Sequence, residues 1–307
     1  MANLFIIGNG FDISHGLATS YQNFHDYLIE NYPNASPDQA FSVPCPITMP
    51  NGSEEYNITE VVSIIMKLFN DIEGDNWSNL EYSMGYLDYD DFLEILNPDD
   101  EDENEWHIAY DNQDVSSNLL DSILMITELF DDWIRTISIS KNVVLKKDFK
   151  NLLNQHQDFF LTFNYTLTLE KIYGVKNICH IHGKQGEKLH FGHGNTKDYY
   201  DDYLDTYPGA EDALNQLHNN LRKNTNQIFE NNIGFFNNLS DISKIYSYGF
   251  SFADVDLLYI RELCKIINTK SIVWMLNDFD GYTKRNSYIR KIQECGFQGT
   301  FDTYHIS

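Results

Sequence analysis

A short apolar segment followed by glycines, within residues 3–17, constrains the fold of this chain more than any other part. Residues 4–7 form a continuous apolar run, and Gly8-Asn9-Gly10 follows it directly. Such runs are typical of strands buried on both faces, as in a parallel sheet. The two glycines would allow positive φ and a close backbone approach to a ligand, and an amphipathic helix is expected from Tyr21 onwards. Strand, glycine turn and helix together predict an anion cradle of the kind that binds a nucleotide phosphate. Ile13 interrupts the G-x-G-x-x-G fingerprint, so an ordinary strand exit is the alternative.

Length and composition favour a folded, globular protein. The chain has 307 residues, of which 42% are hydrophobic, and it can bury one large core, or one core and a second lobe. We find no apolar run of about 18 residues and no basic-then-apolar leader, which predicts a cytoplasmic location without a membrane segment. No CxxC pair occurs, so we expect free thiols and no structural zinc site; the cysteines stand at positions 45, 179, 264 and 295.

The negative charge is concentrated in the first part of the chain. Residues 1–140 contain 27 acidic residues and only two basic ones, which accounts for the whole net charge of −25. Residues 141–307 hold 19 residues of each sign. A negative surface repels phosphate backbones, so nucleic-acid binding through this part is not expected. Solubility alone would explain the charge; the alternative is a docking face for a basic protein partner, or a control on homo-oligomer formation.

The second half alternates strand-like and helix-like segments. Apolar runs at residues 159–163, 178–181, 245–248 and 271–276 predict strands, and helices are expected at 210–240, 254–267 and 282–295. This alternation predicts an α/β fold with a doubly wound, mostly parallel sheet.

The region between the first strand and this second half has a different pattern. Five prolines between positions 33 and 50 break regular structure, and apolar residues then recur at helical spacing as far as residue 130. An acidic loop is expected at 99–103. We therefore predict a Rossmann-like nucleotide-binding domain made of residues 1–32 and 141–307, with an acidic, mostly helical insertion at 33–140.

Four of the predicted strands end in small or polar residues. In an open parallel sheet, ligands bind at the carboxyl ends of the strands, so these ends are expected to form one site. They supply glycines for phosphate approach, a carboxylate, an amide, an imidazole and a hydroxyl. The candidates are Gly8, Asn9, Gly10, Phe11 and Asp12 after the first strand, Asn164 and His182 after the next two, and Gly249 and Ser251 after the fourth.

Some of these residues have structural alternatives. Asn164 could cap the following helix, His182 could be a buried core histidine, and Asp12 could bond its own loop. His180 lies two residues before His182, so on a strand both would point the same way and leave room for a two-histidine metal site. No third ligand is close in sequence, and no metal is expected. Glu81, His190 and His193 are further candidates without a firm assignment.

Six sequence blocks occur in a fixed order along the chain. The first is Ile-Ile-Gly-Asn-Gly-Phe-Asp-Ile-Ser-His-Gly-Leu, and the others lie at residues 77–81, 161–170, 180–183, 191–194 and 248–256. This set resembles the AbiH family of bacterial abortive-infection proteins, and the resemblance covers nearly the whole chain. It implies a protein that stops phage spread by halting or killing the infected cell.

The same blocks are similar to a remote version of the sirtuin-like (SIR2) domain. That resemblance implies that Gly8 and Gly10 face a pyrophosphate, that Asn164 holds a ribose or a water, that His182 is the base, and that Gly249 and Ser251 contact the cofactor. Asn9 and Asp12 depart from the small residues usual in that loop, and the paired cysteines of zinc-containing sirtuins are missing, which argues against protein deacylation. Sirtuin-like defence proteins commonly hydrolyse NAD, so the resemblance implies an NAD glycohydrolase. Asp12 would favour the cationic sugar electrostatically.

Two other functions stay open from the sequence. One is a non-catalytic nucleotide-binding sensor that signals to a partner through the acidic face. The other is a metal-dependent phosphoesterase or nuclease that uses His180 and His182. Loss of NAD would harm the host cell, so we expect the acidic insertion to restrain the activity, either by covering the site or by setting the oligomeric state. The sequence does not name the phage trigger.

Overall fold

The chain divides into two compact units. The computed structural model describes residues 2–40, 42–95, 104–140 and 143–306. The first unit, called here the sheet unit, comprises Met1–Ser20, Ile134–His190 and Asn224–Ser307, and the second, the helical unit, comprises Tyr21–Trp133 and Phe191–Lys223. The helical unit thus includes 21–32 and 191–223 as well as most of the expected insertion. The segment 191–223 joins it because its helices α8 (Tyr200–Thr206) and α9 (Glu211–Asn220) pack against each other, and α9 packs against α5 (Glu105–Leu124). The expected acidic loop at 99–103 lies outside the described residues.

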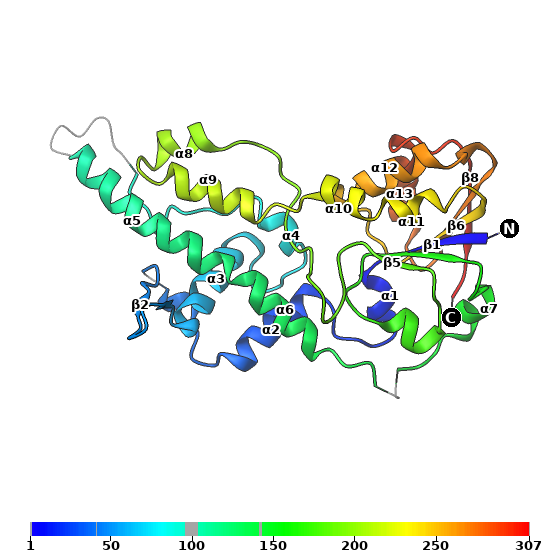
Figure 1. Ribbon diagram of the computed structural model, residues 1–307, viewed down its shortest axis with the longest axis horizontal. Coiled ribbons are helices and arrows are strands. Elements are labelled where there is room, and N and C mark those ends of the chain that lie inside the picture. Colours follow the sequence, from blue (N-terminus) through cyan, green and yellow to red (C-terminus); the bar gives the residue numbers. More distant parts are fainter. Residues whose placement is uncertain (1, 41, 96–103, 141–142, 307) are drawn as a thin grey trace. The chain divides into compact units, whose positions relative to one another are not determined.

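A six-stranded, entirely parallel sheet forms the centre of the sheet unit (Figure 1). The order of its strands is β5-β4-β1-β6-β7-β8. Counted along the chain, this is the order 3-2-1-4-5-6 of doubly wound dinucleotide-binding folds, which reverses direction between the first and fourth strands. The predicted α/β class is therefore confirmed. The strands are β1 (Ala2–Ile7), β4 (Phe159–Thr162), β5 (Ile178–His180), β6 (Ile242–Tyr248), β7 (Val273–Asn277) and β8 (Thr300–Tyr304).

Apolar side chains bury both faces of this sheet, which explains the continuous apolar runs of its strands. Leu4 and Ile6 of β1 face a core formed with the helices that follow β5, β6 and β7. Phe5 and Ile7 face the opposite core, with α7 and the π-helical turn η2. The helices of the unit are α1 (Asn9–Ser14), α7 (Lys147–Leu152), η2 (Leu169–Tyr173), α10 (Thr225–Asn231), α11 (Ile233–Asn237), η3 (Asp254–Asp256), α12 (Leu257–Ile266), η4 (Thr269–Ser271) and α13 (Tyr282–Glu294).

The glycines after β1 differ from the expectation. Neither Gly8 nor Gly10 has a positive φ. The helix expected after Ser20 is present as α2 (Tyr21–Asn31), but a further short helix, α1, begins already at Asn9. The two glycines are instead required by close packing, because a Cβ on Gly8 would lie 2.6 Å from the Gly249 oxygen and a Cβ on Gly10 would lie 2.7 Å from the Gly249 Cα. Gly249 itself has φ +64°. The loops after β1 and β6 therefore meet backbone to backbone at the position where the strand order reverses.

The helices predicted from apolar spacing are present in the helical unit, but one is shorter than predicted. The helical spacing at residues 80–87 corresponds to a single turn only, α4 (Leu80–Ser83). A small hairpin occurs where prolines were expected to break structure. The elements are α2 (Tyr21–Asn31), η1 (Pro37–Gln39), β2 (Ile47–Thr48), β3 (Glu54–Glu55), α3 (Ile58–Glu73), α4 (Leu80–Ser83), α5 (Glu105–Leu124), α6 (Ile126–Thr136, whose last residues belong to the sheet unit), α8 (Tyr200–Thr206) and α9 (Glu211–Asn220).

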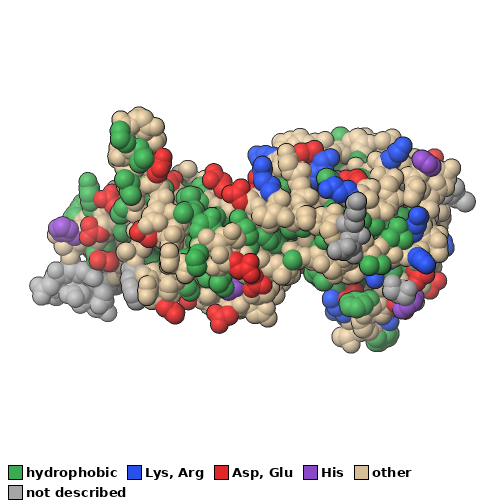
Figure 2. Space-filling view, turned by 90° about the horizontal axis from the view of Figure 1, so that it is seen from below, with side chains coloured by type: hydrophobic (Ala, Val, Ile, Leu, Met, Phe, Trp, Pro, Cys, Tyr) green, Lys and Arg blue, Asp and Glu red, His purple; other side chains and the backbone are tan. Residues whose placement is uncertain are grey.

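The two units differ strongly in charge. The helical unit has 32 acidic and four basic residues, a net charge of −28, whereas the sheet unit has 14 acidic and 17 basic residues, a net charge of +3. Figure 2 shows acidic side chains over the helical unit and most of the visible basic ones over the sheet unit. The net charge of the sheet unit is thus compatible with a small anionic ligand.

Among the described residues, no helix combines the length and the apolar character needed to cross a bilayer.

Candidate functional site

The four predicted strand ends lie in one row across the sheet. Ile7 at the end of β1 is in register with Thr162 of β4 on one side and with Tyr248 of β6 on the other, and Thr162 is in register with His180 of β5. Because all these strands are parallel, the residues that follow them emerge at the same edge. The convergence predicted from the sequence is therefore present in the backbone.

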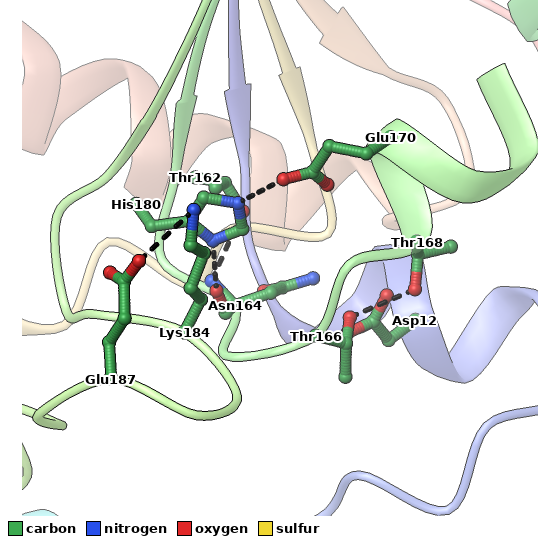
Figure 3. A network of polar contacts seen from close by, with 9 residues as sticks. All are labelled: Asp12, Thr162, Asn164, Thr166, Thr168, Glu170, His180, Lys184 and Glu187. Carbon is green, nitrogen blue, oxygen red and sulfur yellow. Dashed lines mark hydrogen bonds and ion pairs between the residues drawn. The ribbon is translucent and has the colours of Figure 1, made fainter. Parts of the chain in front are cut away.

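Asp12 and Asn164 form a buried polar cluster at this edge (Figure 3). Asp12 is only 1% exposed, and its Oδ2 accepts a hydrogen bond of 2.6 Å from the hydroxyl of Thr166, which lies 2.9 Å from the hydroxyl of Thr168. Two buried oxygens in the cluster, Asp12 Oδ1 and Asn164 Oδ1, have no hydrogen-bond partner among the described residues. Buried acceptors of this kind are costly unless a ligand or water satisfies them, so the cluster is suited to bind hydrogen-bond donors.

The environment of Asp12 makes its carboxyl group titratable near neutral pH. Burial raises the pKa of Asp12 from 3.8 to about 6, although hydrogen bonds from Thr166, Thr168 and Asn164 and the charge of His180 act in the opposite direction. Strongly shifted carboxyl groups are typical of functional sites.

His180 is held by acceptors at both ring nitrogens. Its Nδ1 lies 3.1 Å from the Asn164 carbonyl oxygen, and its Nε2 lies 2.8 Å from Glu170 Oε1 (Figure 3). Burial pushes the pKa of the Glu170 carboxyl up, but the hydrogen bond and charge of His180 outweigh this effect and hold that pKa below its usual value. Since an ionised Glu170 and a carbonyl both require a donor, the arrangement fits an imidazolium that donates from both nitrogens. His180 thereby fixes the backbone of Asn164.

His182 has a different carboxylate partner. Its Nε2 lies 3.1 Å from Asp256 Oδ1, and both side chains are at least nine-tenths buried. The imidazole also contacts aromatic rings of Phe163, Tyr165 and Tyr259. Asp256 was not among the predicted site residues, although it closes the last of the six sequence blocks. Glu170 likewise closes the third block, so the blocks contained a signal for both acids.

The expectation that His180 and His182 point the same way is wrong. Strand β5 ends at His180, and His182 lies in the turn that follows, so the strand alternation does not extend to it. The two histidines consequently reach separate carboxylates, Glu170 and Asp256. In the part of the chain that the structure describes, no group of three or more His, Cys, Asp or Glu side chains is arranged to hold a metal ion.

The residues predicted to touch a cofactor occupy several different positions. The backbone N–H groups of Gly8 and Gly10 donate hydrogen bonds of 3.0 Å to the carbonyl oxygens of Tyr248 and Gly249, respectively. The Asn9 side chain donates to the Thr19 carbonyl. Phe11 belongs to the core of one sheet face, whereas Ser251 is exposed in the loop after β6. In this arrangement the glycines bring two loops together, and their N–H groups are engaged within the protein.

Two pockets border the strands of the sheet unit. One, of about 320 Å³, lies beside the edge strand β5 and is lined by His180, Lys184 and Asn232 among others. The second, of about 10 Å³, has room for about one water molecule and is bordered by Gly249, Phe250 and Asn277. The larger pocket thus adjoins the His180–Glu170 pair rather than the His182–Asp256 pair.

The remaining candidates have structural partners. The backbone N–H of His190 donates a hydrogen bond to the backbone carbonyl of His182, and this contact supports the turn that carries the His182 imidazole. His193 is buried in the helical unit, where its Nε2 lies 2.8 Å from the His218 carbonyl oxygen and burial lowers its pKa to about 4. Glu81 forms an ion pair of 2.7 Å with Lys223, whose side chain is fully buried.

Comparison with known proteins identifies the family. The family model described as "Bacteriophage abortive infection AbiH" matches residues 4–278. The chain belongs to the AbiH family. The match extends from β1 to the end of β7, so it includes the four strand ends, Asp256 and the whole helical unit. AbiH membership implies a role in the abortive infection response to bacteriophage. No curated protein and no solved structure matches the chain significantly.

Proposed function

We propose that this AbiH protein acts in phage defence by hydrolysing NAD at the bond between nicotinamide and ribose. One observation carries the proposal. At the carboxyl edge of the parallel 3-2-1-4-5-6 sheet, two buried acceptor oxygens, Asp12 Oδ1 after β1 and Asn164 Oδ1 after β4, have no partner among the described residues. Sheets of this order bind dinucleotides at that edge, across the point where the strand order reverses. The similarity of the sequence blocks to sirtuin-like domains suggested the same ligand.

The chemistry of the two acceptors suits a ribose. Its hydroxyl groups are donors that would satisfy Asp12 and Asn164, which otherwise leave buried oxygens without hydrogen bonds. The phosphates of a dinucleotide are anionic, and the sheet unit carries a net charge of +3. Binding energy from the distant half of the dinucleotide would position the ribose for reaction.

The proposed reaction consumes one water molecule. His182 takes a proton from the water while the water oxygen bonds to the anomeric carbon of the ribose. The bond between that carbon and the nicotinamide nitrogen breaks, and its electron pair neutralises the pyridinium ring, so nicotinamide leaves uncharged. The products are nicotinamide, ADP-ribose and a proton. Asp12 in its ionised form would stabilise the positive charge that develops on the sugar, and the amide of Asn164 would orient the water.

Burial of these groups gives the proposed enzyme a resting state. Asp12, Asn164 and His182 are each at most 6% exposed, so NAD can reach them only after surrounding side chains move. A low basal rate is what a host needs from an enzyme that depletes its own NAD. The acidic helical unit is our candidate for the control element, through a basic protein partner or through the oligomeric state.

The test is nicotinamide release from NAD by the purified protein, alone and in extracts of phage-infected cells. We expect His182→Ala and Asn164→Ala to reduce release at least about 100-fold, since a general base contributes roughly 10²- to 10⁴-fold. His156→Ala is the matched control, because His156 is an exposed histidine of the same unit. Turnover by both variants at the rate of the unsubstituted protein would overturn the assignment of the residues.

The burial of His182 also favours a second candidate, a nucleotide-binding sensor without catalysis. This function predicts tight binding of NAD with no nicotinamide released, whether or not the phage trigger is present. Calorimetric titration with NAD and with ADP-ribose, followed by analysis of the nucleotide recovered, separates the two functions.

A further inference from the structure

The loop after β7 exposes aromatic side chains at the carboxyl edge of the sheet. Phe279 follows the last residue of β7 by two positions, and its 91% exposure exceeds that of every other large hydrophobic residue that the structure describes. Tyr282, at the first residue of α13, is 75% exposed. Because β7 is parallel to β6 and β1, this loop emerges at the same edge as Gly249 and Asp12. Both rings are therefore accessible to a ligand at that edge.

The backbone on both sides of Phe279 is held in place. Its N–H donates to Oδ1 of Asn277 at 2.9 Å. The guanidinium of Arg285 donates to the carbonyl oxygen of Asp278 at 3.0 Å and to that of Asp280. A ring on a loop that is already ordered loses little conformational entropy when it binds a ligand.

The charge around Phe279 suits an uncharged ligand group. Residues 278–285 contain two acidic and two basic residues, so their charges sum to zero. The carboxylate of Asp280 lies 2.8 Å from the Nζ of Lys284, which offsets its charge. An exposed aromatic ring in a neutral setting is suited to stack on a nucleobase, because every base offers a flat π face.

The loop after β7 is continuous with the proposed site. Gly249 and Asp280 border the same small pocket, and the carbonyl oxygen of Gly249 accepts the N–H of Gly10 at 3.0 Å. Adjacent strands lie about 4.8 Å apart, which places β7 about 10 Å from β1 and about 14 Å from β4. This separation suits a dinucleotide, whose two nucleosides are joined through two phosphates and bind to opposite halves of such a sheet.

We propose that Phe279 stacks on the adenine of the dinucleotide and thereby makes the protein select NAD over a mononucleotide. This inference rests on the proposed function, which places the nicotinamide ribose at Asp12 and Asn164. The adenosine half then lies over β6 and β7, where Phe279 is exposed. Asp12 is only 1% exposed, so the adenosine half can dock before the buried acceptors become accessible.

Calorimetric titration of the full-length protein with ADP-ribose is the first measurement. We expect Phe279→Ala to raise the Kd roughly 5- to 100-fold, which is the effect of losing one stacked base. Phe279→Tyr keeps the ring and should bind within about threefold of the unsubstituted protein, whereas Phe279→Leu keeps the apolar bulk without the π face and should resemble Phe279→Ala. Val144→Ala is the matched control, because Val144 is a 74% exposed apolar residue of the same unit outside the strand ends.

Kinetics with two substrates provide the second measurement. Phe279→Ala should lower kcat/KM for NAD by about the same factor as it weakens ADP-ribose binding. It should change kcat/KM for nicotinamide mononucleotide, which lacks the adenosine half, less than about twofold. Equal losses with both substrates would show a general effect on the site and would overturn the inference.

The binding assay separates this inference from the proposed reaction. Unchanged ADP-ribose affinity in Phe279→Ala would overturn the role of Phe279 even if NAD is hydrolysed at the full rate, and so would the absence of ADP-ribose binding by the unsubstituted protein. If ADP-ribose binding depends on Phe279 but no nicotinamide is released from NAD, with or without extract of infected cells, the adenine site stands and the proposed hydrolysis fails.

Discussion

Replacement of Asp12 by asparagine should stabilise the protein at neutral pH while it abolishes turnover. The reason is the raised pKa of this buried carboxyl, about 6 against an ordinary value of 3.8. The folded protein binds the Asp12 proton more tightly than the unfolded chain does, so the free energy of unfolding falls as pH rises from about 3.8 through about 6. Asparagine is nearly isosteric with the protonated acid and does not titrate.

The size of the effect follows from this difference in pKa. A tenfold difference in proton affinity corresponds to about 1.4 kcal/mol, so ionisation of Asp12 costs the folded state about 3 kcal/mol at pH 8. Roughly 1.4 kcal/mol of that loss falls between pH 5 and pH 8, in a range above the sequence pI of about 4.5. The free energy of unfolding of Asp12→Asn, measured relative to the unsubstituted protein, should therefore increase by this amount over that range.

Urea-induced unfolding at pH 5, 6, 7 and 8 provides the measurement, with equal m-values as the condition for comparison. Asp302→Asn, at an exposed position on β8, is the control and should differ from the unsubstituted protein by less than about 0.5 kcal/mol. A stability difference between Asp12→Asn and the unsubstituted protein that stays constant from pH 5 to pH 8 would refute the reasoning. A gain in stability with loss of activity would show that the buried carboxylate is retained for function at a cost in stability.

Two further substitutions test how each unit is held together. Gly249→Ala should destabilise the sheet unit by more than about 2 kcal/mol, because the left-handed conformation alone costs roughly 1 to 2 kcal/mol and the new Cβ would lie 2.3 Å from the Phe11 nitrogen. Gly234→Ala is the control, because a Cβ added there meets no atom within 4 Å. Equal melting temperatures for the two variants would contradict the packing argument. Lys223→Met should destabilise the helical unit by roughly 3 to 5 kcal/mol because it leaves Glu81 without its buried partner. Lys67→Met, which breaks partly exposed pairs, should cost less than about 1 kcal/mol in the same urea unfolding assay, and a similar loss in both variants would count against a special role for the buried pair.

Much of the sheet could be predicted because its central strands are buried on both faces. The apolar runs of β1, β4 and β7 are continuous and mostly buried. The runs of β5 and β6 are mainly apolar but include the polar residues His180 and Ser247. Strand β8 (Thr300–Tyr304) was not predicted, because it is an edge strand with mostly exposed or half-buried residues and no apolar run. Helix α1 was also missed, since Asn9 and Gly10 are poor helix formers and the helix depends on the contact with Gly249.

The candidate site was predicted only in part, for a similar reason. Strand ends can be read from the sequence, and parallel pairing then places Asp12, Asn164 and His182 at one edge. The partners of the histidines cannot be read in this way. Glu170 lies ten residues before His180 in an irregular π-helical turn, and Asp256 lies 74 residues after His182. Local spacing contains no information about contacts of that kind.

The sequence by itself determined the strand-and-helix class, the parallel sheet and the set of residues that leave its carboxyl edge, because burial on two faces and chain alternation are local properties. The tertiary structure decided which acid meets which histidine, why glycines are needed at positions 8, 10 and 249, and that residues 191–223 join the helical unit. These features depend on the approach of segments far apart in the chain, where the position of a backbone in space, rather than the type of its neighbours, sets each contact.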